Sequence, residues 1–365
     1  MPAAGRRLAA LAAILLAACS TPTSTSTSTL SPGSSSGSAA SPSLTATETP
    51  EASNPAAGPA RWSELSARPA PAKREDHTWT LAGNGQTALL FGGRAGQTVY
   101  DDLWAYDLAG DAWTRLTPVG PAPPGRFGHN AAWVDGIGLV VFAGQNGADF
   151  YNDLWAYDST ANGWRQLPAI GALPVARYGS CAAIGPDGRL WISHGFTSEG
   201  TRFADTRAYD FELSAWSDET PRADLPVNRC LHNCWWTTDG RFVLYGGSTT
   251  GVTALGDAWA LRAGVWTELG AAMPPARNLY AAAKIDPRIV LVFGGQGLDG
   301  GYLNDAWLFE EGLASPVALH AQGSAPPARS GAEMVLDPAR HRVLLFGGKN
   351  DSGPLADQWE LNLGG

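Results

Sequence analysis

A short apolar run that ends in glycine, usually in a glycine pair, recurs six times along this chain of 365 residues. The runs end at Gly93, Gly144, Gly195, Gly247, Gly295 and Gly348, so successive runs lie 48 to 53 residues apart. Each is followed by a second segment that combines an acidic residue with an aromatic one in most copies, as in DDLWAYD (101–107) and NDLWAYD (152–158). A fixed period of this length predicts a repeat architecture, in which each repeat buries its faces against its neighbours.

Two further elements complete the repeat. Four copies continue into an outer strand that begins with tryptophan, at 113–116, 164–167, 216–219 and 266–269. Before each glycine run, a proline-led turn precedes an arginine and an inner strand. These six arginines are Arg74, Arg126, Arg177, Arg229, Arg277 and Arg329.

These motifs resemble the Kelch repeat, and the resemblance covers the chain from about Arg61 to its end. It implies an all-β, six-bladed Kelch-type β-propeller, with four antiparallel strands in each blade around a central channel. Blade 3 departs from the pattern, with Arg207 in place of the second-segment tryptophan and His194 in place of a glycine. Blade 5 lacks the outer-strand tryptophan, and Leu319 is predicted to fill its place.

The sequence RWSEL (61–65) is predicted to close the ring. The sixth repeat runs out after ADQWELN (356–362) without its outer strand, and Trp62-Ser63-Glu64-Leu65 matches that strand. Without it the last blade would expose a ladder edge, and the first and last blades could part. We therefore expect the propeller to span residues 61–365.

Composition agrees with an all-β fold and excludes one class of partner. The 44 glycines and 15 tryptophans suit short aromatic strands joined by glycine-rich turns. The formal net charge is −9, whereas nucleic-acid binding needs a basic face. The sequence therefore predicts no nucleic-acid partner, and it gives no support for direct binding to acidic membranes.

The N-terminus resembles a bacterial lipoprotein signal. Arg6 and Arg7 precede an apolar run that ends in Leu16-Ala17-Ala18-Cys19 and is too short to span a bilayer. The resemblance implies a signal peptide over 1–18, lipidation of Cys19 and a palmitate-type membrane anchor. Residues 19–60 are rich in serine, threonine and proline, and predict a disordered tether. The expected location is the bacterial cell envelope, outside the cytoplasm.

A candidate ligand face is predicted where the turns before the inner strands meet the loops after the glycine pairs. In Kelch domains these two sets of loops share one face, which commonly binds partners. Aromatic, amide and guanidinium groups suit a protein loop or a carbohydrate. For the six repeat arginines, a structural role in fixing the turns through carbonyls or carboxylates is favoured, and ligand contact is the alternative. The candidates are Arg94, Arg126, Phe127, Gln145, Arg177, Tyr178, Phe196, Arg229, Arg277, Asn278, Gln296, Arg329 and Lys349.

Three cysteines besides Cys19 allow one disulfide and one free thiol. Cys181 and Cys234 occupy nearly the same position in neighbouring inner strands, whereas Cys230 and Cys234 lie close in sequence. Bridged Cα atoms must lie within about 7 Å, and strands that line a channel can be further apart, which favours Cys230–Cys234. A metal site at Cys-x-His-x-Cys around His232 is the weaker alternative, because no fourth ligand is evident.

Three functions are consistent with these features. A binding or protein-interaction scaffold, with no cofactor, is favoured by the anchor, the tether and the lack of a clear catalytic cluster. A carbohydrate-active enzyme is the alternative. One enzyme of this type is galactose oxidase, whose pattern needs two histidines and two tyrosines on copper, and no such cluster is visible in the sequence. Another is a sialic acid epimerase, which has a six-bladed Kelch propeller, but no acid–base pair can be assigned here. The third is a structural envelope protein.

Four tryptophans are predicted to lie near the channel or between blades: Trp79, Trp133, Trp235 and Trp236.

Overall fold

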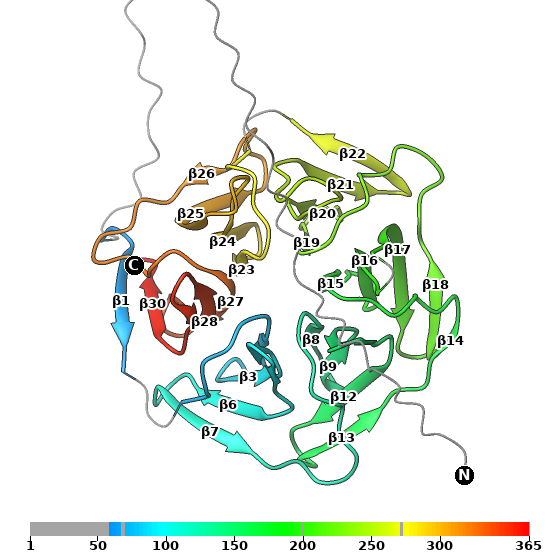
Figure 1. Ribbon diagram of the computed structural model, residues 1–365, viewed down its shortest axis with the longest axis horizontal. Coiled ribbons are helices and arrows are strands. Elements are labelled where there is room, and N and C mark those ends of the chain that lie inside the picture. The colour runs from blue at the N-terminus through cyan, green and yellow to red at the C-terminus, as the bar shows by residue number, and fades with distance from the viewer. Residues whose placement is uncertain (1–57, 67–69, 199, 271–272, 365) are drawn as a thin grey trace, which may run out of the picture. The chain divides into compact units, whose positions relative to one another are not determined.

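The computed structural model describes residues 58–66, 70–198, 200–270 and 273–364. Six antiparallel sheets surround a central axis as the blades of a propeller (Figure 1), and the described residues contain no α-helix. This confirms the predicted all-β, six-bladed fold. The predicted signal peptide (1–18), Cys19 and most of the predicted tether (19–60) lie outside the described residues.

Blades 1 to 3 follow one another along the chain, each from its inner to its outer strand. Blade 1 consists of β2 (Thr78–Leu81), β3 (Thr87–Phe91), β6 (Leu103–Asp107) and β7 (Ala112–Leu116). Blade 2 consists of β8 (Asn130–Val134), β9 (Gly138–Phe142), β12 (Leu154–Asp158) and β13 (Gly163–Gln166). Blade 3 consists of β15 (Cys181–Ile184), β16 (Leu190–Phe196), β17 (Arg202–Asp210) and β18 (Ala215–Asp218), to which β14 (Ile170–Gly171) adds a parallel edge strand.

Blades 4 to 6 complete the ring. Blade 4 consists of β19 (Asn233–Trp236), β20 (Phe242–Tyr245), β21 (Ala258–Arg262) and β22 (Val265–Leu269). Blade 5 consists of β23 (Ala281–Asp286), β24 (Ile289–Gln296), β25 (Tyr302–Glu310) and β26 (Val317–Ala318). Blade 6 consists of β27 (Ser330–Asp337), β28 (Arg342–Asn350), β30 (Gln358–Asn362) and β1 (Arg61–Leu65). Short hairpin strands extend three blades: β4 (Arg94–Ala95) with β5 (Thr98–Val99), β10 (Gln145–Asn146) with β11 (Asp149–Phe150), and β29 (Gly353–Pro354) with β28.

The N-terminal strand closes the ring as predicted. Strand β1 pairs with β30 in an antiparallel register that runs from Arg61–Asn362 to Leu65–Gln358. Figure 1 shows this pairing as a blue strand beside the red blade. Trp62 is 4% exposed, and its ring lies against Phe293 of blade 5.

The hydrophobic core lies between the blades and depends on the outer-strand tryptophans. Each of four tryptophans packs against an aromatic ring on the second strand of the preceding blade. The centroid distances are 5.3 Å for Trp113–Phe346, 5.1 Å for Trp164–Phe91, 5.0 Å for Trp216–Phe142 and 5.2 Å for Trp62–Phe293. Such large buried rings dominate core energetics, so each blade is held by its neighbour.

Blade 5 departs from this packing, and the prediction for Leu319 is wrong. In β26, Val317 pairs with Leu308, so Pro316 comes opposite Phe309 at the position that tryptophan occupies in the other blades. Leu319 instead takes the place of the leucine three residues after that tryptophan, and packs between blades 5 and 6.

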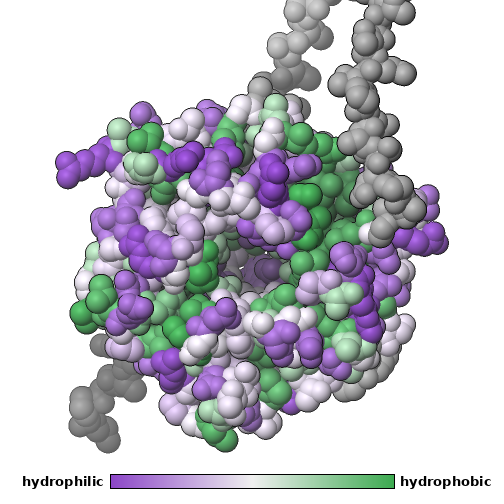
Figure 2. Space-filling model, turned by 180° about the vertical axis from the view of Figure 1, so that it is seen from behind, coloured by the Kyte–Doolittle hydropathy of each residue, from purple (hydrophilic) through white to green (hydrophobic). Residues whose placement is uncertain are grey.

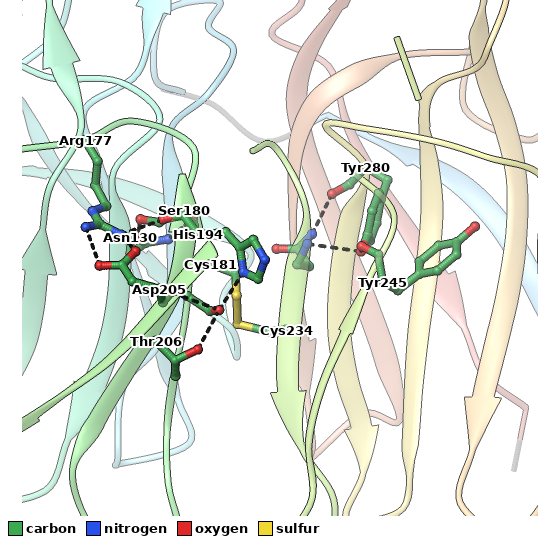
Figure 3. Close-up of a disulfide and its surroundings, with 12 residues drawn as sticks. Asn130, Arg177, Ser180, Cys181, His194, Asp205, Thr206, Cys234, Tyr245 and Tyr280 are labelled. Carbon is green, nitrogen blue, oxygen red and sulfur yellow. Dashed lines mark hydrogen bonds and ion pairs between the residues drawn. A yellow bond between two sulfur atoms is a disulfide. The ribbon is translucent and has the colours of Figure 1, made fainter. Parts of the chain in front are cut away.

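The disulfide joins Cys181 and Cys234, which corrects the preference for Cys230–Cys234. Their Cα atoms lie 5.6 Å apart, within bonding reach, because the inner strands β15 and β19 contact each other. Figure 3 shows the bond between the two side chains. Cys230 is buried with a free thiol. The bond also consumes the Cys234 sulfur, which excludes the predicted metal alternative around His232.

Candidate functional site

The turns before the inner strands and the loops after the glycine pairs meet at one end of the propeller, here called the loop face. The residue after each repeat arginine pairs with the residue after the last glycine of a run. The pairs are Glu75–Arg94, Phe127–Gln145, Tyr178–Phe196, Cys230–Ser248, Asn278–Gln296 and Ser330–Lys349. The structure therefore brings the predicted arginine-turn and glycine-loop candidates to one end.

The six repeat arginines are buried beneath this face, with 0 or 1% of their surface exposed. Each guanidinium makes two bonds to an aspartate in or directly before the third strand and one to the carbonyl that precedes the last glycine of the run. In blade 1, Arg74 donates to Asp102 at 2.7 and 2.9 Å and to the Gly92 carbonyl at 2.8 Å. The partners of the other five are Asp153, Asp205, Asp257, Asp305 and Asp357.

This burial corrects part of the predicted ligand face. The prediction that the repeat arginines contact a ligand is wrong for Arg126, Arg177, Arg229, Arg277 and Arg329, because a ligand cannot reach them. Their bidentate pairing agrees with the structural interpretation, in which they fix the turns. Each Nε also donates to the carbonyl two residues earlier, so all three nitrogens of every repeat guanidinium are bonded within the protein.

A third group holds each aspartate. In five blades a tryptophan two residues later donates its indole N–H, as Trp104 does to Asp102 at 2.8 Å. In blade 3, Arg207 takes this role and donates Nε to Asp205 at 3.2 Å, which explains the departure from the repeat. Burial alone would raise the pKa of Asp205, but the hydrogen bonds and charge of Arg177 and Arg207 hold it below the usual value.

A charged cluster lies on the loop face where blade 6 meets blade 1. Arg94 donates to Asp76, with 3.0 Å between Nη2 and Oδ2, and lies 3.5 Å from Glu75. Lys349 lies 2.9 Å from the other oxygen of Glu75. Burial and the neighbouring Asp76 raise the pKa of Glu75, whereas Arg94 and Lys349 act in the opposite direction. Two cations and two carboxylates thus neutralise one another.

An aromatic belt continues from this cluster across blades 2 and 3. Arg94 stacks on Phe127 at 4.2 Å, and Phe127 contacts Tyr178 with centroids 5.6 Å apart. On the outer side, Phe150 contacts Phe196 at 6.0 Å, and Arg202 lies over Phe196 at 5.5 Å. Tyr178 and Phe196 are backbone neighbours, which makes the belt continuous. We define it as Phe127, Phe150, Tyr178 and Phe196, flanked by Arg94 and Arg202.

The predicted amide residues serve the loop backbone. Gln145 donates to the Gly147 carbonyl at 3.2 Å, and Gln296 donates to Gly300 at 2.8 Å. Asn278 is 2% exposed and donates to the Thr253 carbonyl at 2.6 Å. These three side chains therefore shape the hairpins, while the belt offers the aromatic surface.

A ring of six backbone hydrogen bonds encircles the channel just beneath the loop face. Each N–H donates to the equivalent carbonyl of the preceding blade, at 2.7 to 3.0 Å, and the last bond returns to the first residue. All six residues have positive φ, between 48° and 63°. The members are Asp76, Gly128, Gly179, Leu231, Leu279 and Gly331. The ring narrows the channel at this end and links all six blades.

The channel below this ring forms a cavity of about 440 Å³. Figure 2 shows a hollow at the centre of the molecule with hydrophilic residues at its base. Thr78, Asn130, Asn233 and Glu333 supply polar groups to the lining. Burial, followed by the charge of Asp76, raises the pKa of Glu333 to about 8. Of the four tryptophans predicted near the channel, Trp79, Trp133 and Trp235 line this cavity.

Four histidines are buried between the blades. Burial, followed by the charge of a nearby arginine, lowers the pKa of His129 and His194 to about 3. Burial also lowers the pKa of His77 and His232. His194 has a φ of 59° in the place of a glycine, and its Nδ1 lies 2.7 Å from the Ser193 hydroxyl. These neutral imidazoles are part of the core.

Two other kinds of site are absent from the described ranges. No three histidine, cysteine, aspartate or glutamate side chains there are grouped so as to hold a metal ion. No helix long and apolar enough to cross a membrane was found among the same residues.

Sequence reasoning missed the ring and the charged cluster. One signal for the ring was present: a glycine stands two residues after Arg126, Arg177 and Arg329. The other three blades carry Asp76, Leu231 and Leu279 at this position, so the sequence shows no repeated glycine there. The acidic pair Glu75-Asp76 stood beside Arg74 in sequence, but the sequence did not show its partners. Arg94 meets it through the Glu75–Arg94 pairing within blade 1, and Lys349 of blade 6 meets it only because the ring closes.

Known proteins that are similar to this chain in sequence also contain Kelch repeats or match it over its blades. The domain family described as the KLHDC2/KLHL20/DRC7 Kelch-repeats domain matches residues 59–247. The chain is 28% identical over 300 residues to Adagio-like protein 3 of Oryza sativa subsp. japonica, which covers 76% of this chain and 46% of that protein. It is 29% identical over 236 residues to Kelch domain-containing protein 10 of Xenopus laevis, with 61% and 56% covered.

A shorter match, 31% identical over 203 residues, is to multiple epidermal growth factor-like domains protein 8 of Mus musculus. It covers 51% of this chain and 7% of that protein. The chain thus spans about half the length of the first curated relatives that it matches. With the six blades and the repeated arginine–aspartate pairs, these matches show that the chain belongs to the Kelch-repeat β-propeller family.

Proposed function

We propose that this protein is a protein-binding scaffold of the bacterial cell envelope, and that the aromatic belt on its loop face contacts the partner. The belt carries this proposal, because it breaks the symmetry of the ring. At the equivalent paired positions, blades 4 to 6 carry Cys230 and Ser248, Asn278 and Gln296, and Ser330 and Lys349. Phe150, Tyr178 and Phe196 are half-buried at this surface, whereas Phe127 is 5% exposed and supports Tyr178 from beneath, which corrects its prediction as a ligand contact. Partly exposed aromatic residues flanked by arginine are the composition of binding hot spots.

The envelope location rests on the sequence. A basic flank, an apolar run and Leu16-Ala17-Ala18-Cys19 support export and lipidation, and residues 19–60 would hold the propeller away from the membrane. Labelling of cells with a palmitate analogue tests this. We expect the label on the wild-type chain and its loss in Cys19→Ala, with release of the protein from the membrane fraction. Label retained in Cys19→Ala would contradict the anchor.

Binding is tested by photo-crosslinking in whole cells. A crosslinking residue at position 196, within the belt, is expected to capture one defined protein, while the same residue at position 265 on the outer strand of blade 4 captures none. Phe150→Ala should reduce capture at position 196, because truncation of a hot-spot aromatic weakens binding by more than about 1 kcal/mol. Equal capture at both positions would contradict a role for the belt.

A glycan-binding assay on the same variants tests the carbohydrate alternative. Binding of one sugar class that is lost in Phe196→Ala, with no protein captured, would replace the scaffold proposal by carbohydrate recognition.

A further inference from the structure

A second cavity, of about 430 Å³, lies between blades 4 and 5. Loops from the end opposite the loop face contribute to its lining, including residues 311–316 between β25 and β26 (Figure 1). Its apolar lining consists mainly of Trp235, Trp236, Val243, Leu269, Val290 and Phe309. The volume and the largely apolar walls are those of small-molecule sites in proteins.

The missing tryptophan of blade 5 accounts for this cavity. In five blades an outer-strand tryptophan pairs with a third-strand residue, as Trp113 does with Tyr106. In blade 5 this place falls to Pro316, which carries no aromatic ring. Phe309 contacts Tyr245 at 5.0 Å and Trp235 at 5.2 Å, but the cavity remains. A cavity left by a missing side chain in an apolar core can bind an aromatic ring, as an engineered cavity of about 150 Å³ binds benzene.

The charged residues around the cavity leave two cations available. Arg241 is paired with Asp239 at 2.9 Å, and the Glu311 carboxylate accepts from the N–H and hydroxyl of Thr238. Lys284 and Arg288 are exposed and form no ion pair within the described residues. With Glu310, the lining carries three cations against two carboxylates, and Lys284 and Arg288 are its two cations outside an ion pair, so an anion is favoured beside these two side chains.

Backbone contacts hold both cations at the cavity. Lys284 donates Nζ to the Trp236 carbonyl at 3.0 Å, and Arg288 donates Nη2 to the Glu311 carbonyl at 3.1 Å. Each retains further N–H groups for a ligand. The bonds from Thr238 to Glu311 tie the 311–316 loop to blade 4, which fixes both walls before binding.

We propose that this cavity binds a small aromatic carboxylate, with its ring in the place of the missing tryptophan and its carboxylate at Lys284 and Arg288. The ligand is either a free metabolite of this chemistry or the C-terminal aromatic residue of a polypeptide. The site is separate from the aromatic belt and does not depend on the proposed scaffold function.

Calorimetric titration of the full chain tests the proposal, with indole-3-acetate, indole and a peptide ending in tryptophan as probes. We expect saturable binding of indole-3-acetate and at least tenfold weaker binding of indole, because hydrogen bonds to a charged group are then lost. Tighter binding of the peptide would identify a polypeptide source, and tighter binding of indole-3-acetate a free one. No saturable binding of any probe at millimolar concentration would overturn the proposal.

Two substitutions that fill the cavity locate the site. Pro316→Trp restores the repeat and is expected to abolish binding of indole-3-acetate. Gly270→Trp is the second variant, because Gly270 lines the cavity and a Cβ added there meets no atom within 4 Å. Unchanged affinity in a folded variant of either kind would show that the probe binds elsewhere.

A charge substitution separates the carboxylate from the ring. Lys284→Gln should weaken indole-3-acetate binding about tenfold while leaving indole unchanged. Lys73→Gln, an exposed lysine beside the loop face, is the matched control and should change neither. Equal effects of both lysine substitutions would point to a non-specific charge effect and contradict the assigned site.

Discussion

The indole ring of Trp62, on the first described strand, packs against Phe293 of blade 5 with the ring centroids 5.2 Å apart. The same strand pairs along its whole length with β30 near the end of the described chain. One short segment therefore supplies both the edge of blade 6 and the aromatic layer between blades 5 and 6. The circular arrangement depends on this contact, because every other blade is made from one continuous stretch of chain.

Replacement of Trp62 by alanine should destabilise the protein strongly. Truncation of a buried tryptophan typically lowers the free energy of unfolding by about 3–5 kcal/mol, and Trp62 is 4% exposed. Ser63→Ala is the control, because it removes one hydrogen bond to Glu360, worth about 1 kcal/mol. Urea unfolding compares the two. Equal losses would mean that closure does not depend on the indole.

Loss of the Cys181–Cys234 disulfide should weaken the contact between blades 3 and 4. The bond closes a segment of 53 residues, and a native disulfide of this kind contributes about 2–4 kcal/mol. Unfolding of the Cys181→Ala/Cys234→Ala variant measures the loss. Alkylation and peptide mass spectrometry under denaturing, non-reducing conditions should modify Cys230 and neither of the other two. Modification of Cys181 would show a different pairing.

Gly128 in the backbone ring should not tolerate a side chain. Its φ is 59°, and a Cβ added there would lie 1.9 Å from Cε2 of Tyr178. Gly96 has the same φ with nothing within 4 Å, so Gly96→Ala measures the backbone strain alone, about 1–2 kcal/mol. Gly128→Ala should lose about 1–3 kcal/mol more from overpacking. Thermal unfolding that gives the same loss for both would show that Tyr178 moves away freely.

Stability should fall on acidification below about pH 6.5. The folded state holds His77, His129, His194 and His232 neutral through burial, with the pKa of His129 and His194 at about 3. The unfolded chain takes up protons near pH 6.5, so it binds more protons than the folded state below that pH, and the free energy of unfolding decreases.

Urea unfolding at pH 7 and pH 5 measures this dependence on pH. His77→Phe should reduce it, because neither ring nitrogen of His77 has a hydrogen-bond partner among the described residues. His320→Gln replaces an exposed histidine and is the control. An unchanged pH dependence in His77→Phe would contradict the assignment.

Glu333 should act in the opposite direction, as the pH rises towards 8. Burial and Asp76 raise its folded-state pKa to about 8, so between the unfolded value near 4.3 and pH 8 the folded state holds the extra proton. Stability from this group is therefore lost as pH rises through this range. Glu333→Gln should reduce the loss between pH 6 and 9, whereas exposed Glu64→Gln should not. Parallel curves for both variants would rule out a titrating Glu333.

The sequence by itself determined the blades, their number and the closing strand, because the signals for these are local and repeat in phase. The tryptophan of RWSEL and the missing outer strand of the sixth repeat were both visible in the chain. The structural role of the repeat arginines could be predicted from their recurrence in every repeat. Their full burial could not, because it depends on the aspartate at the third strand with which each arginine pairs in the folded blade.

Only the tertiary structure decided the features that depend on neighbouring blades. The Cys181–Cys234 bond needs the convergence of two inner strands, which no spacing in the sequence reveals. The Lys349–Glu75 pair, the backbone ring and the cavity beside Pro316 all join residues of different blades. Repeat patterns report what each blade shares, whereas sites arise where unlike side chains meet across the ring, and that meeting is set by packing in three dimensions.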